Sequence, residues 1–366
     1  MSSAHPWTDN RVHLREAAAL AKAGYDVGLY AIDNDLEAGN TGVRVARVPR
    51  SGRLSRIVVG SARAVRAALA SRAEVVHLHD PELMWAVPVL QAAGRTVIYD
   101  AHEDLPSQVM HKPYLPTPVR RPVAWATRAL LAVADRADGV IAATETVARR
   151  FKPDHTTVVR NYPQHVEGSE PVPVERRSNT VVYVGGLSAA RGMDELVEAC
   201  ADPGFPAEWR VSLAGPGSET YVASLAQRPG WTRVDFHGLV APLEARRLVG
   251  EAKVGLVVLR DTPNHREALP TKMFEYMASG TPVIASDFPL WRQILTEHDC
   301  GLLVDPTRPS EIAQAIRRYA QDPELLERHS RNALVASRGE LNWEAESVRL
   351  VEAYRALGVH PPHGRE

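Results

Sequence analysis

Residues 267–280 read EALPTKMFEYMASG and are followed directly by TPVIASD, so loop, helix and strand signals meet in one short segment. Pro270 suits the first turn of a helix, where its missing N–H group leaves no hydrogen bond unmade, and Gly280 suits the position just after a helix. We therefore predict a helix over 269–279, with Glu267 in the loop before it and Glu275 inside it. The apolar run at 282–287 predicts a buried strand directly afterwards.

The start of this helix predicts a binding site for an anion. The N–H groups of Thr271, Lys272 and Met273 have no partner inside the helix, and the positive end of the helix dipole lies beside them. Glu267 and Glu275 stand on different elements, so we expect them to contact different parts of one extended ligand and not to act as an acid–base pair. Two glutamates at this spacing also occur by chance on an ordinary surface helix.

The rest of the chain repeats an alternation of apolar strands and amphipathic helices. Strand-like runs lie at 26–32, 43–48, 74–79, 96–100 and 139–143, and again at 180–187, 209–215, 233–240, 254–259, 282–287 and 301–305. Near-continuous apolar strands separated by helices predict parallel sheets that are covered on both faces. We therefore predict an α/β protein of two doubly wound, Rossmann-like parallel-sheet domains that face each other across a cleft, with ligands at the carboxyl ends of the strands.

The polar, proline-rich stretch 163–179 is the best linker candidate in the chain. We predict a first domain over 1–165, a second over 180–345 and a C-terminal helix over 346–366 that returns to the first domain. A doubly wound domain opens with its central strand, whereas only the last residues of such a strand fit into MSSAHPWTDN (1–10). We expect either a chain start downstream of the true one or a shortened first strand. We favour a shortened start that truncates the first strand, in which case a chain extended upstream should have a markedly higher melting temperature.

The bulk composition is that of an ordinary globular protein. Of the 366 residues, 45% are hydrophobic and 24% are charged, which gives no reason to expect disorder. No apolar run is long enough to cross a membrane, and the start shows no signal-peptide pattern. Cys200 and Cys300 lack the spacing of metal ligands, so a reduced, cytoplasmic setting is the simplest interpretation.

Positive charge is concentrated in the first half of the chain. Eight arginines and no acidic residue lie between Glu37 and Glu74, although the net charge of the whole chain is only −1. This run is either a solvated face or a surface that meets an anionic partner, such as membrane headgroups or a phosphorylated acceptor. It contains no aromatic residues, which disfavours single-stranded nucleic acid as a partner.

Residues 119–139 predict an amphipathic helix that either packs on its own sheet or rests on an anionic membrane.

Two further groups of residues carry metal-ligand atoms, and we expect neither to hold a metal. Residues 33–35 (DND) form the D-x-D pattern of metal-dependent transferases, but they follow an early strand, far from residues 267–287. His77, His79 and Asp80 lie at a predicted buried strand. Because the side chains of a strand alternate between its two faces, we expect the two histidines to point apart and not to share an ion.

The pattern E-x7-E followed by MASGTPVIAS resembles the donor-site signature of the family 4 glycosyltransferases, which are retaining enzymes with the two-domain GT-B fold. The likeness covers essentially the whole chain. Residues 181–199 and 234–240 resemble the start of that family's nucleotide-binding domain and its base-contacting segment. Residues 77–84, 98–109 and 158–163 resemble bacterial exopolysaccharide-type members.

The resemblance implies roles for individual residues. Glu275 would hydrogen-bond the ribose of the nucleotide, Glu267 would contact the hydroxyls of the donor sugar, and Arg191 would bind the diphosphate with Lys272 as a second ligand. His102 matches a histidine that faces the donor sugar from the first domain, although a structural histidine at a strand end gives the same pattern. The implied catalytic residues are His102 and Glu267. The implied donor-binding residues are Gly185, Gly186, Arg191, Gly238, Leu269, Pro270, Thr271, Lys272 and Glu275.

The chain departs from the family pattern in two places. Gly185 and Gly186 stand where many members have Gly-Arg, so one phosphate-binding arginine is missing. Residues 5–12 (HPWTDNRV) replace a glycine-rich loop. We expect the acceptor to contact Asn10, Arg11 and Asp104.

The resemblance implies a retaining hexosyltransferase that moves a sugar from a UDP- or GDP-sugar to an acceptor hydroxyl, in exopolysaccharide or other cell-surface glycan assembly. The implied acceptor is a sugar or a lipid-linked sugar, with peripheral contact at the inner face of an anionic cell membrane, and neither nucleic acid nor a metal cofactor is expected. The departing phosphate would itself take the acceptor proton, so the protein would mainly stabilise developing charge. The alternatives are a tailoring glycosyltransferase of a small natural product, a sugar-nucleotide epimerase and a non-catalytic nucleotide-binding homologue.

Overall fold

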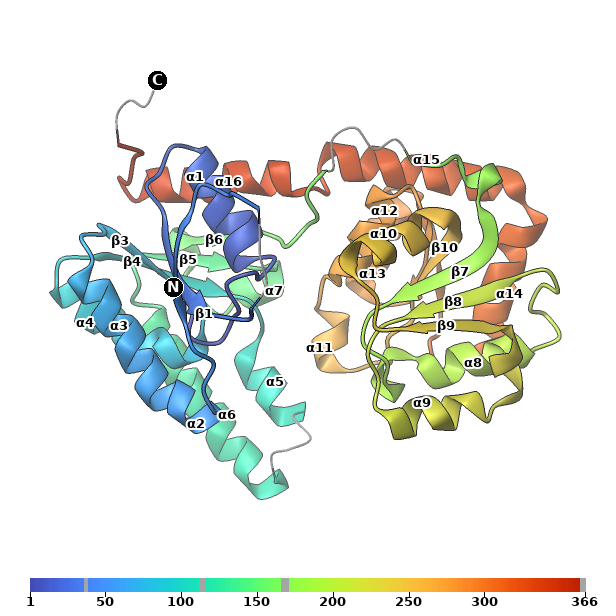
Figure 1. The fold of residues 1–366 in the computed structure, drawn as a ribbon, viewed down its shortest axis with the longest axis horizontal. Coiled ribbons are helices and arrows are strands. Elements are labelled where there is room, and N and C mark those ends of the chain that lie inside the picture. Colours follow the sequence, from blue (N-terminus) through green and yellow to red (C-terminus); the bar gives the residue numbers. More distant parts are fainter. Residues whose placement is uncertain (36–38, 112–115, 166–170, 363–366) are drawn as a thin grey trace. The chain divides into compact units, whose positions relative to one another are not determined.

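A computed structural model describes residues 1–35, 39–111, 116–165 and 171–362. The chain forms two compact units (Figure 1). The first unit consists of Met1–Asn161 together with the chain from Trp343 onward, and the second unit is Tyr162–Asn342. The chain therefore crosses between the units twice. The predicted linker at 163–179 belongs to the second unit, as far as the structure describes it.

The second unit contains a six-stranded parallel sheet with the order β12-β11-β10-β7-β8-β9. Its strands are β7 (Ser178–Val184), β8 (Arg210–Ala214), β9 (Val234–Gly238), β10 (Ala252–Val257), β11 (Val283–Ser286) and β12 (Gly301–Val304). Each overlaps a strand predicted from the apolar runs. The predicted α/β class with a parallel sheet is confirmed for this unit.

Both faces of this sheet are buried. Along β7, Val181 and Tyr183 belong to one apolar cluster and Val182 belongs to the other, because successive side chains of a strand point to opposite faces. The helices that cover the sheet are α8 (Met193–Ala201), α9 (Glu219–Ala226), α10 (Pro242–Glu251), α12 (Thr271–Ala278), α13 (Pro289–Glu297), α14 (Pro309–Gln321) and α15 (Pro323–Gly339). A short helix, α11 (Pro263–Arg266), precedes α12. Burying each large apolar side chain contributes about 1.5–3 kcal/mol, which makes this double-sided core the main source of stability.

The first unit contains two parallel sheets. The four-stranded sheet has the order β3-β4-β5-β6, and a separate pair joins β1 to β2. The strands are β1 (Gly28–Ile32), β2 (Arg44–Val48), β3 (Val75–Leu78), β4 (Thr96–Ala101), β5 (Gly139–Ala142) and β6 (Thr156–Val158). The first five overlap the predicted runs, so the parallel α/β class is confirmed here too.

Residues 1–7 lie between the two sheets of this unit. The N–H group of Ser2 donates to the carbonyl of Tyr30 on β1 at 2.8 Å, and the N–H group of His79 donates to the carbonyl of Met1 at 3.2 Å. This segment therefore occupies the place of a central strand. Only Pro6 makes a strand-like bridge, to Ile32.

The helical elements of the first unit, in the described part of the chain, are a π-helical turn (Val12–Ala17) that continues into α1 (Ala18–Lys22), α2 (Arg53–Ser55), a second π-helical turn (Arg56–Gly60), α3 (Ser61–Ala70), a 3-10 turn (Pro81–Ala86), α4 (Val87–Ala92), α5 (Leu105–His111), α6 (Thr117–Ala134), α7 (Glu145–Ala148), a second 3-10 turn (Pro153–His155) and α16 (Trp343–Ala356). Three of these helices, α3, α6 and α16, have 10, 18 and 14 residues, and the others are shorter. The amphipathic helix predicted at 119–139 corresponds to α6. Within the described part of the chain, none of the helices is both long and apolar enough to cross a membrane.

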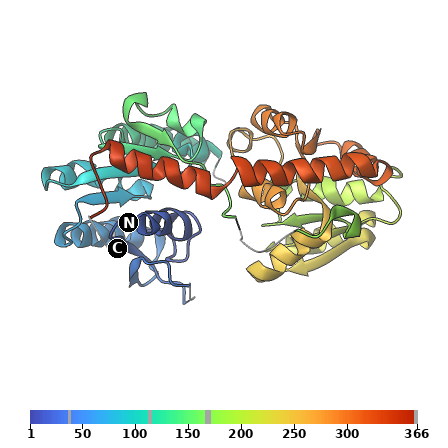
Figure 2. The ribbon, with the colours of Figure 1, turned by 90° about the horizontal axis from the view of Figure 1, so that it is seen from above.

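Helix α16 completes the core of the first unit. Its side chains Trp343, Leu350 and Tyr354 are buried with Ile98 of β4 and Ile141 of β5. Figure 2 shows α16 lying along this unit, next to the long helix α15 in sequence. Residues from both ends of the described chain thus build one core.

Candidate functional site

Helix α12 begins at Thr271, two residues later than the sequence predicts. Pro270 is the N-cap residue with φ −69° and ψ 118°, so it is extended and not in the first helical turn, and the helix ends at Ala278. The N–H group of Met273 donates to the carbonyl of Pro270 at 3.0 Å. Our prediction that Met273 offers a free N–H group is therefore wrong, and the amides left at the open end are those of Thr271 and Lys272.

Lys272 is the most unusual residue of this segment. Only 9% of the residue is exposed, and its Nζ atom has no hydrogen-bond partner. The Nζ atom lies 3.8 Å from the centre of the Tyr183 ring, a cation–π contact. Burial, and then the positive charge of Arg191, lower the pKa of Lys272 to about 7. A buried ammonium group without an anionic partner is costly, which indicates that an anion belongs beside it.

Two glycines leave room for that anion. A Cβ atom on Gly185 would lie 2.8 Å from Nζ of Lys272 and 3.6 Å from a guanidinium nitrogen of Arg191. Gly185 has φ +145°, a conformation that side chains rarely adopt. Gly215 has φ +140°, and a Cβ atom there would lie 2.0 Å from the carbonyl oxygen of Gly185. The backbone at this point therefore approaches both cations closely because it carries no side chains.

The same glycines connect the carboxyl ends of three neighbouring strands. The N–H group of Gly185, after β7, donates to Ala214 of β8 at 2.9 Å. The N–H group of Gly215, after β8, donates to Gly238 of β9 at 2.7 Å. Gly186 accepts from the hydroxyl of Tyr183 at 2.9 Å. The predicted residues Gly185, Gly186 and Gly238 thus lie at one edge of the sheet, where ligands bind in such folds.

Helix α12 is held so that Lys272 points at this edge. Tyr276 lies one turn after Lys272, on the same face of the helix, and is buried. Its hydroxyl oxygen accepts from the N–H group of Val184 at 2.9 Å, which ties α12 to the end of β7. A Cβ atom on Gly255 would lie 2.2 Å from the Tyr276 ring, so only glycine fits below it.

Both predicted glutamates of the donor segment are exposed. Glu275 lies on α12, one turn after Lys272, and Glu267 lies at the end of α11. The loop between these helices is anchored by the Trp291 indole, which donates to the carbonyl of Ala268 at 2.7 Å. The predicted donor residues Leu269, Pro270 and Thr271 are half-buried in and after this loop.

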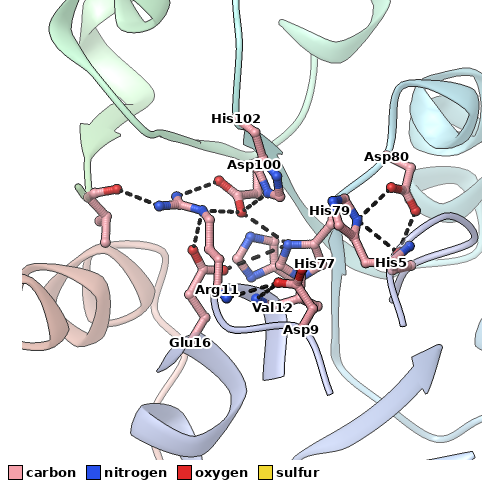
Figure 3. Close-up of polar contacts among 12 residues, drawn as sticks. His5, Asp9, Arg11, Val12, Glu16, His77, His79, Asp80, Asp100 and His102 are labelled. Carbon is pink, nitrogen blue, oxygen red and sulfur yellow. Dashed lines mark hydrogen bonds and ion pairs between the residues drawn. The ribbon is translucent and has the colours of Figure 1, made fainter. Parts of the chain in front are cut away.

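In the first unit, the predicted residue His102 belongs to a polar cluster around the buried carboxylate of Asp100 (Figure 3). Asp100 contacts Nε2 of His102 at 2.6 Å and Nδ1 of His79 at 3.0 Å, and it accepts from the Arg11 guanidinium at 2.8 Å and 3.1 Å. Burial alone would raise the pKa of Asp100, but Arg11 and His102 together hold it well below its usual range. The second nitrogen of His102, Nδ1, remains available to a ligand.

The three residues predicted for the acceptor have different environments. Arg11 is buried, pairs with Asp100 and with Glu16 at 2.9 Å, and donates to the carbonyl of Val159 at 2.9 Å. Our prediction that Arg11 faces the acceptor is therefore wrong, because its charge is used inside the unit. Asn10 is exposed, and Asp104 is half-buried and pairs with Arg150 at 2.5 Å.

The expectation that His77 and His79 point apart is also wrong. Their rings stack with centroids 4.4 Å apart, because residues two apart on a strand share a face. Metal-ligand atoms of Glu16, His77, His79 and Asp100 lie within 4.8 Å of one another. Arg11 pairs with both carboxylates of this group and already supplies positive charge there. Residues 33–35 lie apart from this group.

A cavity of about 570 Å³ lies on the other side of this cluster. Its lining includes Met1, Glu16, His77 and Tyr354, together with the beginnings of β1 and β3. Ligands of doubly wound sheets bind at the carboxyl ends of the strands. This cavity extends from the opposite, amino end of the strands as far as His79, and its lining includes neither Asp100 nor His102.

Sequence reasoning missed the roles of three residues of the first unit. Asp100 and Asp80, which end or follow buried strands, organise the polar groups at the edge of the sheet, and His5 pairs with Asp80 at 2.9 Å. A buried acid at the carboxyl end of a parallel strand is a signal that points to both aspartates. Nothing in the local pattern of residues 1–10 singles out His5.

The two units correspond to two family models. The description "Glycosyltransferase Family 4" matches residues 10–161, and "Glycosyl transferases group 1" matches residues 178–322. The chain belongs to the family 4 glycosyltransferases. The resemblance inferred from the sequence is thereby confirmed, and both matched ranges fall within the units that the structure separates.

Curated relatives of this family 4 chain have different substrates in their names. It is 27% identical over 182 residues to an alpha-D-kanosaminyltransferase from Streptomyces kanamyceticus, with 49% of this chain and 46% of the relative covered. It is also 27% identical over 185 residues to a D-inositol 3-phosphate glycosyltransferase from Geodermatophilus obscurus, with 48% of this chain and 40% of the relative covered. The matches thus span less than half the length of these relatives.

Solved structures confirm the GT-B fold of this family 4 chain. A sucrose-phosphate synthase from Thermosynechococcus elongatus superposes with a TM-score of 0.74 at 21% identity, covering 93% of this chain and 91% of the other. The Anabaena protein HepE, in complex with UDP and glucose, superposes with a TM-score of 0.69 at 17% identity, covering 93% and 94%. At these identities the likeness concerns the fold alone.

Proposed function

We propose that this chain is a retaining glycosyltransferase that moves a hexosyl group from a nucleoside-diphosphate sugar to an acceptor hydroxyl. The observation that carries the proposal is the buried Nζ atom of Lys272, which lacks a hydrogen-bond partner and lies beside Gly185 and Arg191. A diphosphate supplies the two negative charges that these two cations call for. Membership of family 4 and a UDP-binding neighbour of the same fold support this choice of ligand.

In the proposed reaction, the protein mainly stabilises the leaving group. Arg191, Lys272 and the open N–H groups of α12 hold the diphosphate while the bond to the sugar breaks and negative charge builds on the phosphate oxygen. Glu275 binds the ribose, and Glu267 orients the sugar. The leaving phosphate oxygen takes the proton of the acceptor hydroxyl on the same face of the sugar, which gives retention without a separate carboxylate base.

We propose that the reaction requires no metal. Metal-dependent transferases place a divalent cation against the diphosphate. Here Lys272 and Arg191 provide two cationic groups at the glycine loop, so the charge of the diphosphate is already matched.

For the acceptor, we propose a sugar or lipid-linked sugar in the assembly of an exopolysaccharide or another cell-surface glycan. The relatives named after kanosamine transfer and inositol 3-phosphate favour a second candidate, the glycosylation of a small hydroxylated molecule. A sugar-nucleotide epimerase and a non-catalytic nucleotide-binding protein are further alternatives. All of these candidates would bind a nucleotide. An assay of sugar transfer to different acceptors is therefore needed to separate them.

We also propose peripheral contact with an anionic membrane through the first unit. Leu54 on α2 is 81% exposed and Trp125 on α6 is 71% exposed. Helix α6 carries the exposed Arg121 and Arg128, and the exposed Arg50 precedes α2. The 3-10 turn Pro81–Ala86 contacts both α3 and α6, and its Trp85 is exposed as well. Exposed apolar side chains among arginines are typical of surfaces that rest on acidic lipid headgroups. Such contact would bring a lipid-linked acceptor to the first unit.

The test of the proposed function is a donor screen. Titration calorimetry with UDP, GDP and ADP identifies the base, and release of that nucleotide from a panel of its sugar derivatives identifies the sugar. We expect binding of one diphosphate and slow hydrolysis of one matching donor without added metal. Binding without hydrolysis or transfer would favour the non-catalytic alternative, and binding of none of the three nucleotides would refute the proposal.

A further inference from the structure

A loop at the start of the chain is organised by one buried carboxylate. The Oδ2 atom of Asp80 accepts from the hydroxyl of Ser2 at 2.7 Å and from the N–H groups of Ser3 at 2.5 Å and Ala4 at 3.0 Å. The hydroxyl of Ser2 also accepts from the N–H group of His5 at 2.8 Å. These bonds fix the backbone of residues 2–5 in one conformation.

The loop presents the imidazole of His5. Its Nδ1 atom pairs with Oδ1 of Asp80 at 2.9 Å, so Nε2 is the nitrogen available to a ligand. The His5 side chain remains 30% exposed, although Asp80 beneath it is buried. A carboxylate that holds one ring nitrogen of a histidine fixes the orientation of the other nitrogen.

His102 is held in the same way, and it is next to His5. The two rings have centroids 5.2 Å apart (Figure 3). Nε2 of His102 contacts Asp100 at 2.6 Å, which leaves Nδ1 available, and its side chain is 22% exposed. The molecule thus contains two adjacent imidazole–carboxylate pairs, each with one nitrogen left for a ligand.

Both pairs lie at the edge of the sheet where ligands bind. Asp80 follows β3 and His102 follows β4, and these two strands are parallel neighbours. Their carboxyl ends therefore meet at one edge. Residues 5–12 are also the stretch in which this chain departs from the family's glycine-rich loop.

The charges around His5 favour a neutral ligand over an anion. Burial alone would lower the pKa of His5, but Asp80, with smaller contributions from Asp9 and Asp100, raises it above the ordinary value. The raised pKa widens the pH range in which His5 is protonated, and a protonated His5 donates a hydrogen bond from Nε2. The carboxylates of Asp9, Asp80 and Asp100 outnumber the cations His5 and Arg11 here. This excess of negative charge disfavours an anion but not the neutral hydroxyl groups of a polyol.

We propose that His5 and His102 form a two-imidazole subsite that binds hydroxyl groups of a neutral polyol acceptor, such as a sugar ring or a cyclitol. This inference rests on the proposed glycosyl transfer and assigns the acceptor side of that reaction. His5 positions the acceptor through Nε2, and Asp80 positions His5. In this chain, the subsite would bind the acceptor in place of Arg11, for which we had expected that role.

The experiment compares His5→Ala and His5→Gln with the unaltered protein and with His155→Gln. His155 is a suitable control because it is also a partly exposed histidine that pairs with aspartates, at 3.1 Å to Asp154 and 3.4 Å to Asp135. It precedes β6 and so lies at the amino end of the sheet. Each protein is assayed for nucleotide affinity, donor hydrolysis and transfer to the best acceptor from a panel of monosaccharides and cyclitols.

We expect His5→Ala to raise the acceptor KM about tenfold or more, the scale of one lost charge-assisted hydrogen bond, while nucleotide affinity and donor hydrolysis change less than about twofold. His5→Gln keeps an N–H donor and should recover part of the loss, and His155→Gln should have no effect. In the unaltered protein, kcat/KM for the acceptor should fall as pH rises through the raised pKa of His5, and this fall should be absent in His5→Gln. An acceptor KM of His5→Ala equal to that of the unaltered protein would overturn the proposal.

A second measurement does not depend on turnover. Histidine imidazole NMR signals of the full chain are recorded during titration with the same panel sugars, without nucleotide. Shifts confined to the His5 and His102 signals support the subsite, and unshifted signals at saturating sugar contradict it. Shifts in a protein that binds no nucleotide would refute the proposed function and leave the polyol subsite standing.

Discussion

The lowered pKa of Lys272 should make ligand binding depend on pH. A lysine with a pKa of about 7 is only half protonated at neutral pH, whereas an exposed lysine is almost fully charged. The groups that act on it are the Arg191 guanidinium, the Glu275 carboxylate and the buried surroundings that include the Tyr183 ring. A diphosphate placed between the two cations favours the protonated form, so ligand binding and proton uptake are coupled.

The first prediction concerns this coupling. Nucleoside-diphosphate affinity should fall as pH rises above about 7, with a limiting slope of about tenfold per pH unit, because binding then requires proton uptake by Lys272. Calorimetry in two buffers with different ionisation enthalpies measures the uptake directly. The Lys272→Met variant should bind about 10- to 100-fold more weakly and take up no proton. Equal proton uptake in this variant would show that another group titrates.

The second prediction separates the two exposed glutamates. Glu275→Ala should weaken nucleotide binding about tenfold, because it removes the ribose contact that the family pattern implies. Glu267→Ala should leave nucleotide affinity within about twofold and mainly reduce turnover, because its proposed contact is with the sugar. Calorimetry with the free nucleotide and a nucleotide-release assay distinguish the two effects. Unchanged turnover in Glu267→Ala would rule out its proposed role.

At the scale of elements, the glycine loop is the feature on which the site depends most. Gly185 and Gly215 lie where two strand ends approach each other, and each has a backbone conformation that other residues rarely adopt. The strand ends β7, β8 and β9 are thereby joined into one surface below α12. A side chain in this loop would occupy the space that we assign to the diphosphate.

The third prediction tests the loop. Gly215→Ala should destabilise the protein by about 1–3 kcal/mol and weaken nucleotide binding, because its Cβ atom would lie 2.0 Å from the Gly185 carbonyl oxygen. Gly250→Ala, in helix α10, is the matched control because a Cβ atom there meets nothing within 4 Å. It should be neutral or stabilising by up to about 1 kcal/mol. Chemical denaturation and calorimetry measure both variants, and equal stabilities would contradict the assigned strain.

The fourth prediction concerns helices α2 and α6. The double variant Leu54→Ser/Trp125→Ser should bind vesicles of anionic lipid more weakly than the unaltered protein, and binding should weaken further in high salt. Leu243→Ser, an equally exposed leucine on α10 of the second unit, is the control and should bind normally. Co-sedimentation with anionic and neutral vesicles measures the difference. Equal binding to neutral vesicles would exclude a role for the arginines.

The sequence predicts elements of this protein better than contacts between them. Each apolar run became a strand. In β5, β10 and β11, nearly continuous burial on both faces leaves little choice of residue, whereas β2 was found by its apolar pattern although it is largely exposed. The start of α12 was misplaced by the proline, which suits both the N-cap and the first turn. The burial of Lys272 was not predictable, because it depends on the approach of Gly185, far away in the sequence. The orientations of His77 in β3 and of His79 just after it were predicted wrongly, although residues two apart along a strand point to the same face.

At the scale of the whole molecule, the first unit is assembled from two distant parts of the chain. Helix α16 contributes Leu350, which is fully buried against residues of β4 and β5. The second unit is continuous in sequence. The two units therefore have separate cores, and a substitution in one core should act mainly on that unit.

The fifth prediction tests this separation. Leu350→Ala should lower the free energy of unfolding of the first unit by about 2–5 kcal/mol, because it leaves a cavity in a closed core. Val348→Ala, an exposed position on the same helix, should change it by less than about 0.5 kcal/mol. Nucleotide affinity, which we propose to reside in the second unit, should be the same in both variants under native conditions. Loss of nucleotide binding in Leu350→Ala would show that the units do not fold independently.

The way α16 closes the first unit also sets an order of events at the ribosome. The second unit is complete as soon as Asn342 has left the exit tunnel, whereas the first unit lacks part of its core until residues 343–356 follow. Domains generally fold as units during synthesis. The sheet made first is therefore finished last, and until then its apolar face at Ile98 and Ile141 stays open to chaperones or to non-native partners.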